Sequence, residues 1–371
     1  MANQERHSCG TDMRHLGGTL RSITMDNLAP LSGIRVVDLG WLTAGAASAT
    51  LLLDLGAEVI KIEGPGALDP FRDWTGAEPG TDWWNQSPFY NFTNRGKRSV
   101  CLDLKDPRGQ AVVLRLLENA DILVENYRRG VLESFGLAPK MLREKFPRLI
   151  VASISSQGSD GPERDMVSFG STLEATAGLA ALTGPNGGDA AITGRNINYP
   201  DQVVCLFAAG AIISALARRD KTGEGVHLDL SQRELTSFLL GEELLAAAAG
   251  APSARLGNAS RDDAAEAVIR VDEGWQVVWS TGAAPVRDGI AVAESEKFRS
   301  GTAVLQGPDG IPAKGVPFSF GTWPASIRRG GAKLGESNAA ALQDAGLSMQ
   351  EIHELKEAGI LAEAPRRGPA R

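Results

Sequence analysis

An α/β protein with a doubly wound, Rossmann-like parallel sheet is the fold that this sequence predicts, and three observations indicate it. Short apolar runs, of the kind that fill buried parallel strands, alternate with helical segments from residue 34 to residue 155. The first strand, helix and strand fit within about 30 residues, which is the size of a βαβ unit. The 371 residues, 43% of them hydrophobic, are enough to bury a large core and form two domains.

The strands and helices of this sheet can be placed in order. The strands are expected at Ile34–Leu39, Glu58–Glu63, Ser99–Leu104, Asp121–Tyr127, Leu149–Ser155 and Gly225–Ser231. Helices are expected at Ala44–Ala57, at Gly109–Ala120 after the cap Asp106 and Pro107, within Arg128–Phe146, and as one long helix over Ser231–Gly250. The turn after the first strand lacks a GxGxxG pattern, so the sequence does not favour a nicotinamide-binding site.

Shifts in composition divide the chain into four parts. Residues 1–30 are interpreted as a loosely ordered extension, and residues 361–371 as a disordered tail rich in Pro and Arg. Residues 31–250 together with 316–360 form the large Rossmann-like domain, with KGVPFSF returning as a strand and two short helices closing it. Residues 251–315 are Gly-, Asp- and Ala-rich with short β-like runs, and we interpret them as a small, truncated second domain.

Composition also excludes several classes of protein. A net charge of −7 argues against a nucleic-acid binder, which would carry a basic field. The three cysteines and four scattered histidines have no metal-ligand spacing, so we expect no metal and a reducing compartment. The first 25 residues lack the apolar core of a signal peptide, and no run of about 18 apolar residues occurs. We therefore expect a cytoplasmic protein without a membrane partner.

The segment from Thr193 to Gly225 presents an aspartate at the start of a long apolar helix. We expect Pro200 to hold a non-helical approach and Asp201 to be the N-cap. The residues from Val203 to Leu216 are nearly all apolar or small, so the helix is expected to be buried on most sides. From spacing alone, Asp201 is either a simple cap or a nucleophile. Cys205, one turn later, is typical of an inert buried residue.

Basic residues gather near the strands of the predicted sheet. Ligands of doubly wound sheets bind beyond the carboxyl ends of the strands. The residues at or near strand ends are Lys97, Arg98, Lys105, Arg128 and Arg129. Together they predict a basic patch suited to a phosphorylated cofactor, although any single one could be a solvated surface residue.

Eight ordered segments carry a family resemblance. LSGIRVVDLG, LGAEVIKIEGPG, NRGKRSVCLDLKDPRG, ADILVENYRRGVLESFGL and RDKTGEG come first, and GAAPVRDG, KGVPFSF and KLGES follow near the C-terminus. In this order and spacing the chain resembles the family III CoA-transferases, which include the formyl-CoA, carnitine and benzylsuccinate CoA-transferases. The resemblance implies a Rossmann-like large domain, a small domain, and an interlocked dimer of two chains.

The resemblance also implies a chemistry. The family nucleophile is an Asp before a long helix that ends in a Lys-Thr-Gly turn, and counting back from Lys221 gives Asp201. An ionised carboxylate that needs no base would attack the acyl-CoA thioester, and a nearby helix N-terminus would keep it ionised. By the same resemblance coenzyme A is the substrate, no metal takes part, and the CoA-binding residues are Thr43, Ala44, Leu102, Lys105, Asn126, Tyr127 and Arg128.

The chain departs from the family pattern at several places. Phe169-Gly170 stands where members often have Asp or Glu, and a racemase of the same family needs a His-Asp pair there, so racemase activity is disfavoured. Gly64 and Ser134 replace two Arg residues that contact CoA in the family. The shortened small domain predicts a heteromer with a full-length homologue, resembling benzylsuccinate CoA-transferase. The rival hypothesis is a non-catalytic CoA-binding subunit of such a heteromer.

Overall fold

The computed structural model describes residues 29–74, 82–193, 198–259, 267–272, 274–296, 304–306, 312–315, 327 and 329–366. The expected N-terminal extension lies outside these residues except for Ala29 and Pro30, and so does most of the expected strand KGVPFSF.

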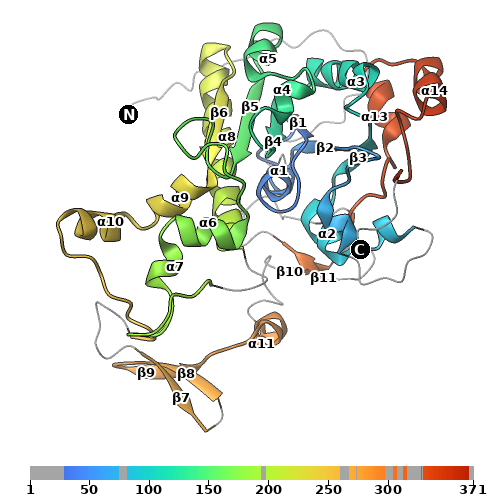
Figure 1. The fold of residues 1–371 in the computed structure, drawn as a ribbon. Coiled ribbons are helices and arrows are strands. Elements are labelled where there is room, and N and C mark those ends of the chain that lie inside the picture. The colour runs from blue at the N-terminus through green and yellow to red at the C-terminus, as the bar shows by residue number, and fades with distance from the viewer. Residues whose placement is uncertain are drawn as a thin grey trace, which may run out of the picture.

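A six-stranded, all-parallel sheet forms the centre of the fold (Figure 1), as the sequence predicts. The strand order is β3-β2-β1-β4-β5-β6, which is the order of doubly wound dinucleotide-binding domains. The strands are β1 (Arg35–Asp38), β2 (Glu58–Glu63), β3 (Arg98–Cys101), β4 (Ile122–Glu125), β5 (Ile150–Ser155) and β6 (His227–Ser231). The order reverses between β1 and β4, and a crevice at such a point is where these sheets bind ligands.

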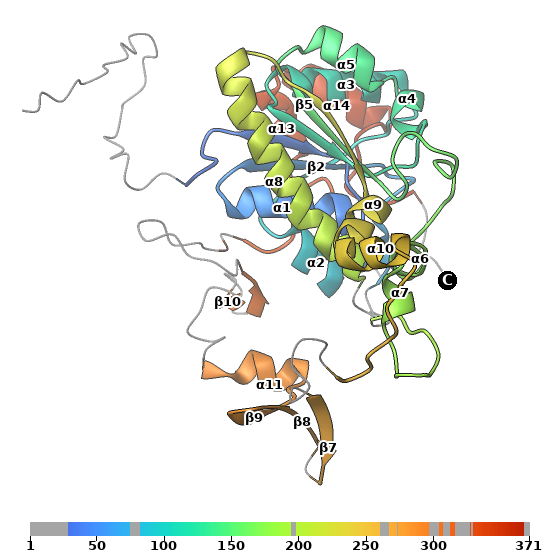
Figure 2. The same ribbon diagram turned by 90° about the vertical axis from the view of Figure 1, so that its left-hand side faces the viewer.

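Helices cover both faces of the sheet because neighbouring residues of each strand point to opposite faces. Val36 packs against α1 (Ala44–Asp54) and α8 (Tyr199–Thr222), whereas Val37 packs against the layer of α3 (Pro107–Glu118), α13 (Asn338–Asp344) and α14 (Met349–Glu357). Figure 2 shows α1 and α8 in front of the sheet and α13 and α14 behind it. Both faces are therefore buried, which explains why the strands read as continuous apolar runs.

The long helix α8 begins earlier than the sequence analysis expected. Its N-cap is Asn198, Pro200 lies in the first turn, and Asp201 is inside the helix rather than at its cap. The reason is that proline tolerates the first helical turn, where its missing N–H needs no partner. Gly223 ends the helix in a left-handed conformation, as expected. By length and composition α8 could cross a membrane, but half of its apolar window is buried inside the protein.

Shorter helices connect the strands. They are η2 (Pro70–Asp73), η3 (Trp83–Asn85), α2 (Pro88–Asn94), α4 (Val131–Ser134), α5 (Pro139–Lys145), α6 (Gly170–Thr176), α7 (Leu179–Leu182), α9 (Gln232–Phe238) and α10 (Gly241–Ala248). The single helix expected over Ser231–Gly250 is wrong, because the chain turns at Leu239 and Leu240 between α9 and α10. Ser231 caps α9 by accepting a hydrogen bond from the backbone N–H of Glu234.

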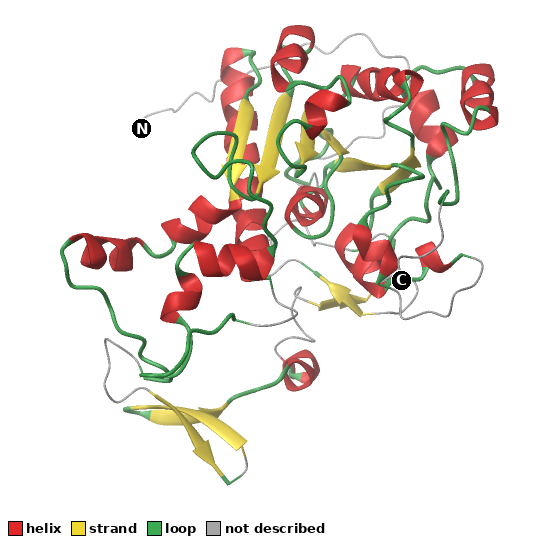
Figure 3. Ribbon diagram, viewed as in Figure 1, coloured by secondary structure: helices red, strands yellow, loops and turns green. Residues whose placement is uncertain are grey.

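A small second lobe follows α10 and is coloured orange in Figure 1. It holds an antiparallel sheet of three strands and a separate two-stranded ribbon, both visible in Figure 3. Its elements are β7 (Ala267–Val271), β8 (Gly274–Trp279), β9 (Gly282–Pro285), α11 (Gly289–Glu294), β10 (Val304–Gln306) and β11 (Pro312–Lys314). The chain then returns to the large domain through α13 and α14.

Candidate active site

A cavity of about 910 Å³ opens beyond the carboxyl ends of the parallel strands. Seven of the eight residues that the sequence analysis assigned to the site line it, namely Thr43, Ala44, Lys105, Asn126, Tyr127, Arg128 and Asp201. The loops after β1 and β4 supply most of them, so the cavity lies at the reversal point of the strand order. This size is in the range of pockets that hold organic ligands.

Leu102 is the exception among these eight residues. Its side chain is fully buried in the core on the α3 face, and its backbone pairs with Leu361 in an isolated bridge. The physical reason is strand alternation, because Leu102 continues the inward-facing set of Val100 and not the set that reaches the cavity. Leu102 therefore does not line the cavity, and its expected role in CoA binding stays a prediction.

The loop after β1 is clamped to the loop after β4. Asn126 accepts a hydrogen bond from the backbone N–H of Trp41 at 2.7 Å and donates its own amide N–H to the Trp41 carbonyl at 3.0 Å. Leu42 follows with φ of +53°, a strained conformation for a branched residue, and its N–H donates to Asp69 at 3.2 Å. These bonds fix the backbone of Thr43 and Ala44 at the edge of the cavity.

Asp201 lies in the first turn of α8, half-buried against the cavity. Burial raises the pKa of its carboxyl group to about 6. Desolvation therefore outweighs the expected effect of the helix N-terminus on this pKa, and the group is still mainly ionised at pH 7. The Sγ atom of Cys205 lies 2.9 Å from the Asp201 carbonyl oxygen and 3.5 Å from that of Thr43. The buried thiol thus connects the first turns of α8 and α1.

The predicted basic patch is only partly correct. Lys105 and Arg128 line the cavity. Lys97 is instead buried beneath α1, where it donates to Asp38 at 2.7 Å, and Arg98 pairs with Glu58 and Asp344. Both precede β3 or begin it, so they lie at the wrong end of that strand to reach the cavity.

Two further arginines change the composition of the patch. Arg129 lies outside the cavity and pairs with Asp165 at 2.5 Å. Arg366 lines the cavity, although the sequence analysis placed it in a disordered tail. Its backbone N–H donates to Pro65 at 2.8 Å, and its guanidinium pairs with Asp103. The pattern of the tail gave no signal for this role, because Arg366 is held by contacts distant in sequence.

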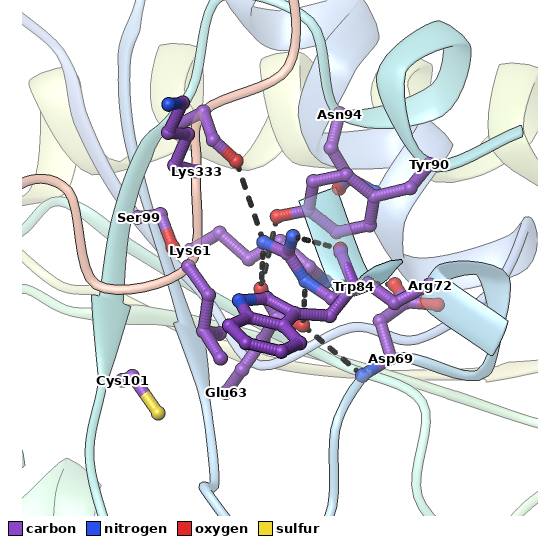
Figure 4. Close-up of polar contacts among 12 residues, drawn as sticks. Lys61, Glu63, Asp69, Arg72, Trp84, Tyr90, Asn94, Ser99, Cys101 and Lys333 are labelled. Atoms are coloured by element: carbon purple, nitrogen blue, oxygen red, sulfur yellow. Dashed lines mark hydrogen bonds and ion pairs between the residues drawn. The ribbon is translucent and has the colours of Figure 1, made fainter. Parts of the chain in front are cut away.

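A buried polar network supports the wall of the cavity (Figure 4). Glu63 receives two hydrogen bonds of 2.8 Å from Arg72 and one of 2.9 Å from the Tyr90 hydroxyl. Burial alone would raise the pKa of Glu63, but the Arg72 guanidinium outweighs it and lowers that pKa to about 2. Asp69 pairs with Lys61 at 3.0 Å and donates its N–H to Glu63. The network therefore anchors Asp69, which holds the strained Leu42.

The absence of a side chain at position 170 is explained by Asn198, the N-cap residue of α8. A Cβ atom at this position would lie 2.5 Å from the Cγ atom of Asn198, so no other residue fits without displacing that amide. The space that an acidic side chain would need at position 170 is therefore taken by the neutral amide of Asn198, directly before the first turn that carries Asp201. No group of three or more His, Cys, Asp or Glu side chains suited to a metal occurs within the described residues.

The chain is similar in sequence to known proteins. A family model described as CoA-transferase family III matches residues 31–303. A succinate–glutarate CoA-transferase of Agrobacterium fabrum is 35% identical over 67% of this chain and 62% of its own length. The alpha subunit of a succinyl-CoA–L-malate CoA-transferase of Chloroflexus aurantiacus is 36% identical over 57% of this chain and 49% of its own. The chain thus spans about half to two thirds of the length of these relatives.

A solved structure extends the similarity of the fold. A CAIB/BAIF family protein from Brucella suis superposes with a TM-score of 0.79 at 24% identity, over 85% of this chain and 99% of that one. At this identity the likeness concerns the fold alone. The superposed region includes nearly the whole of the Brucella chain.

Proposed function

Because the chain belongs to CoA-transferase family III, we propose that it moves CoA from an acyl-CoA donor such as succinyl-CoA to the carboxylate of an organic acid. The observation that carries this proposal is the position of Asp201, a carboxylate in the first turn of a buried helix at a cavity that also contains Lys105, Arg128 and Arg366. Donors of the succinyl-CoA class are suggested by the names of the relatives. We place the reaction in the cytoplasm.

The proposed chemistry proceeds through Asp201. Its carboxylate attacks the thioester carbonyl, which forms a mixed anhydride and releases CoA thiolate. The thiolate attacks the aspartyl carbonyl, which gives an aspartyl-CoA thioester and frees the donor carboxylate. The acceptor carboxylate then attacks this thioester, and the thiolate released attacks the new acyl group, which restores Asp201. The first turn of α8 offers backbone N–H groups for the oxyanions.

The three cations of the cavity suit the phosphates of CoA. Replacing Lys105 and Arg128 together by Ala is expected to weaken CoA binding by about 1–3 kcal/mol for each lost charge-assisted contact. Calorimetric titration with CoA measures this effect. Arg129→Ala is the matched control, because Arg129 follows Arg128 but lies outside the cavity. Unchanged CoA affinity in the double variant would move the nucleotide to another site.

The proposed assembly is a heteromer, intertwined with a full-length homologue. Large apolar side chains lie exposed on neighbouring helices, including Leu206 of α8, Phe238 of α9 and Leu245 of α10, which are 62%, 70% and 72% exposed. Exposed apolar side chains of this size are typical of protein interfaces, which supports the proposed assembly. A partner of the same family would cover it and exclude water from the thioester and the anhydride.

Expression tests this assembly and the proposed activity together. Alone, the chain is expected to aggregate or to lack CoA transfer, and co-expression with a homologue is expected to yield an active complex with an interface above ~2,000 Å². A stable homodimer with full transferase activity would overturn the heteromer and leave the enzyme proposal standing. A stable complex that binds CoA but transfers none would favour the rival function of a non-catalytic subunit.

A further inference from the structure

The cavity has two chemically different ends. Lys105 follows β3, Arg128 follows β4, and Arg366 lies beside Asp103, so the cations gather beyond the β3 and β4 side of the sheet. Gln232 follows β6, two strands beyond β4 and thus about 10 Å further along the sheet edge. Among the described lining residues from the loop after β5, the start of α8 and the start of α9, Asp201 is the one ionisable side chain, and the others carry amides, hydroxyls or apolar groups.

The side-chain oxygen of Gln232 has no hydrogen-bond donor among the residues that the structure describes. It is only 6% exposed, and its Oε1 atom is buried without a donor among the described residues. Buried amide oxygens are nearly always hydrogen-bonded, and an orphaned one destabilises the protein. Gln232 is the first residue of α9, whose cap is already supplied by Ser231. The amide is therefore not needed to cap the helix, and it lines the cavity that contains Asp201.

The amide of Asn198 lies at the same end. As the N-cap of α8 it makes no side-chain capping bond and packs against Gly170 instead. Ser168 has a different arrangement, because its hydroxyl accepts a hydrogen bond from Gln157 at 2.9 Å. The groups around Asp201 thus form a neutral polar wall, in which Gln232 is the buried group that still requires a donor.

The unpartnered Oε1 atom of Gln232 restricts which chemical groups of a ligand could bind it. A carboxylate is an acceptor only and cannot satisfy Oε1, and an alkyl chain offers no polar group. A hydroxyl group donates to Oε1 and also accepts from the amide N–H. We propose that Gln232 is a specificity-determining residue that binds a hydroxyl group on the organic acid, so that the preferred substrates are hydroxy acids. This inference rests on the proposed CoA-transferase function.

Matched acids that differ in one hydroxyl group test this inference. With succinyl-CoA as donor, and with a co-expressed homologue if the active complex requires one, kcat/KM is measured for citramalate against 2-methylsuccinate and for lactate against propionate. We expect the wild-type protein to prefer the hydroxy acid of at least one pair by ~10-fold or more, as in sites that hydrogen-bond a substrate hydroxyl. Gln232→Leu is expected to remove this preference by lowering only the rate with the hydroxy acid.

A control variant and a binding measurement complete the test. Gln202→Leu removes an amide next to Asp201 that does not line the cavity, and it is expected to keep the preference. Calorimetric binding of the same acids to the CoA-saturated protein gives a readout that does not require turnover. Absence of transfer with a hydroxyl preference retained in binding would contradict the proposed function alone.

Two results would overturn the hydroxy-acid inference. One is equal binding and equal rates for both members of each pair in the wild-type protein. The other is an equal loss with both acids in Gln232→Leu, because the amide would then contact the pantetheine arm of CoA, whose N–H groups are also donors.

Discussion

Asp201→Asn is expected to lower the rate of CoA transfer by at least ~10³-fold while leaving the fold intact, as follows from loss of a covalent nucleophile. The amide has nearly the same size as the carboxyl group but cannot form the anhydride. Steady-state kinetics of the active assembly measure the loss. Asp220→Asn, at the exposed opposite end of the same helix, is the control and is expected to keep wild-type turnover.

Because the pKa of Asp201 is raised, the rate of CoA transfer by the wild-type protein is expected to depend on pH. Only the ionised carboxylate attacks, so the wild-type rate is expected to fall as the pH decreases through about 6. The folded-state pKa lies above the unfolded value of 3.8, so the stability that the protonated group contributes is lost as the pH rises from 3.8 through about 6. Asp201→Asn, which never ionises, is therefore expected to be at least as stable as the wild type at pH 7. Near-normal turnover in this variant would refute the nucleophile assignment.

Arg72→Met is expected to destabilise the large domain by about 3–5 kcal/mol, the cost of leaving a buried charge without its partner. Arg72 and Glu63 are both completely buried, and the guanidinium also lies 3.5 Å from the centre of the Tyr90 ring. Chemical denaturation monitored by tryptophan fluorescence measures the change. Loss of this pair also loosens Asp69, so CoA binding is expected to weaken even in the folded fraction.

Two control variants separate the buried pair from a general effect of charge. Arg108→Ala removes an exposed arginine that pairs with Asp106, and it is expected to leave stability almost unchanged, because solvent screens an exposed ion pair. Glu63→Leu combined with Arg72→Met removes both charges and is expected to recover part of the loss, because no buried charge remains unpaired. If Arg72→Met and Arg108→Ala destabilised the protein equally, the network in Figure 4 would not be the support that we describe.

The sheet could be predicted from sequence because its signals are local. Runs such as Ile34–Leu39 and Glu58–Glu63 place Val, Ile or Leu residues on both strand faces, and the glycines and prolines between elements mark the turns. The βαβ order then restricts the topology to a few possibilities. Asp106 and Pro107 similarly start α3 where expected. The start of α8 differs from the expected one because Asp201 favours an N-cap position, whereas Pro200 favours the first helical turn.

The environment of the site could not be predicted in the same way, because it depends on contacts between distant segments. Lys97 has the sequence context of a surface lysine, yet Asp38 and the Ala46 carbonyl hold it inside the protein. Arg366 reaches the cavity from a tail that lacks helical or strand periodicity. Gln232 is one of several polar residues after β6, and only the folded structure shows that its amide oxygen is buried without a donor among the described residues.

Mass spectrometry of the protein quenched in acid during turnover with acyl-CoA tests the central claim most directly. The proposed mechanism predicts a peptide that contains Asp201 with CoA attached through a thioester, a gain equal to the mass of CoA less one water. The adduct is expected to disappear in Asp201→Asn and to persist in Asp220→Asn. CoA attached to another residue, or transfer of CoA without any adduct in an assay that detects a known acyl-enzyme, would contradict the account.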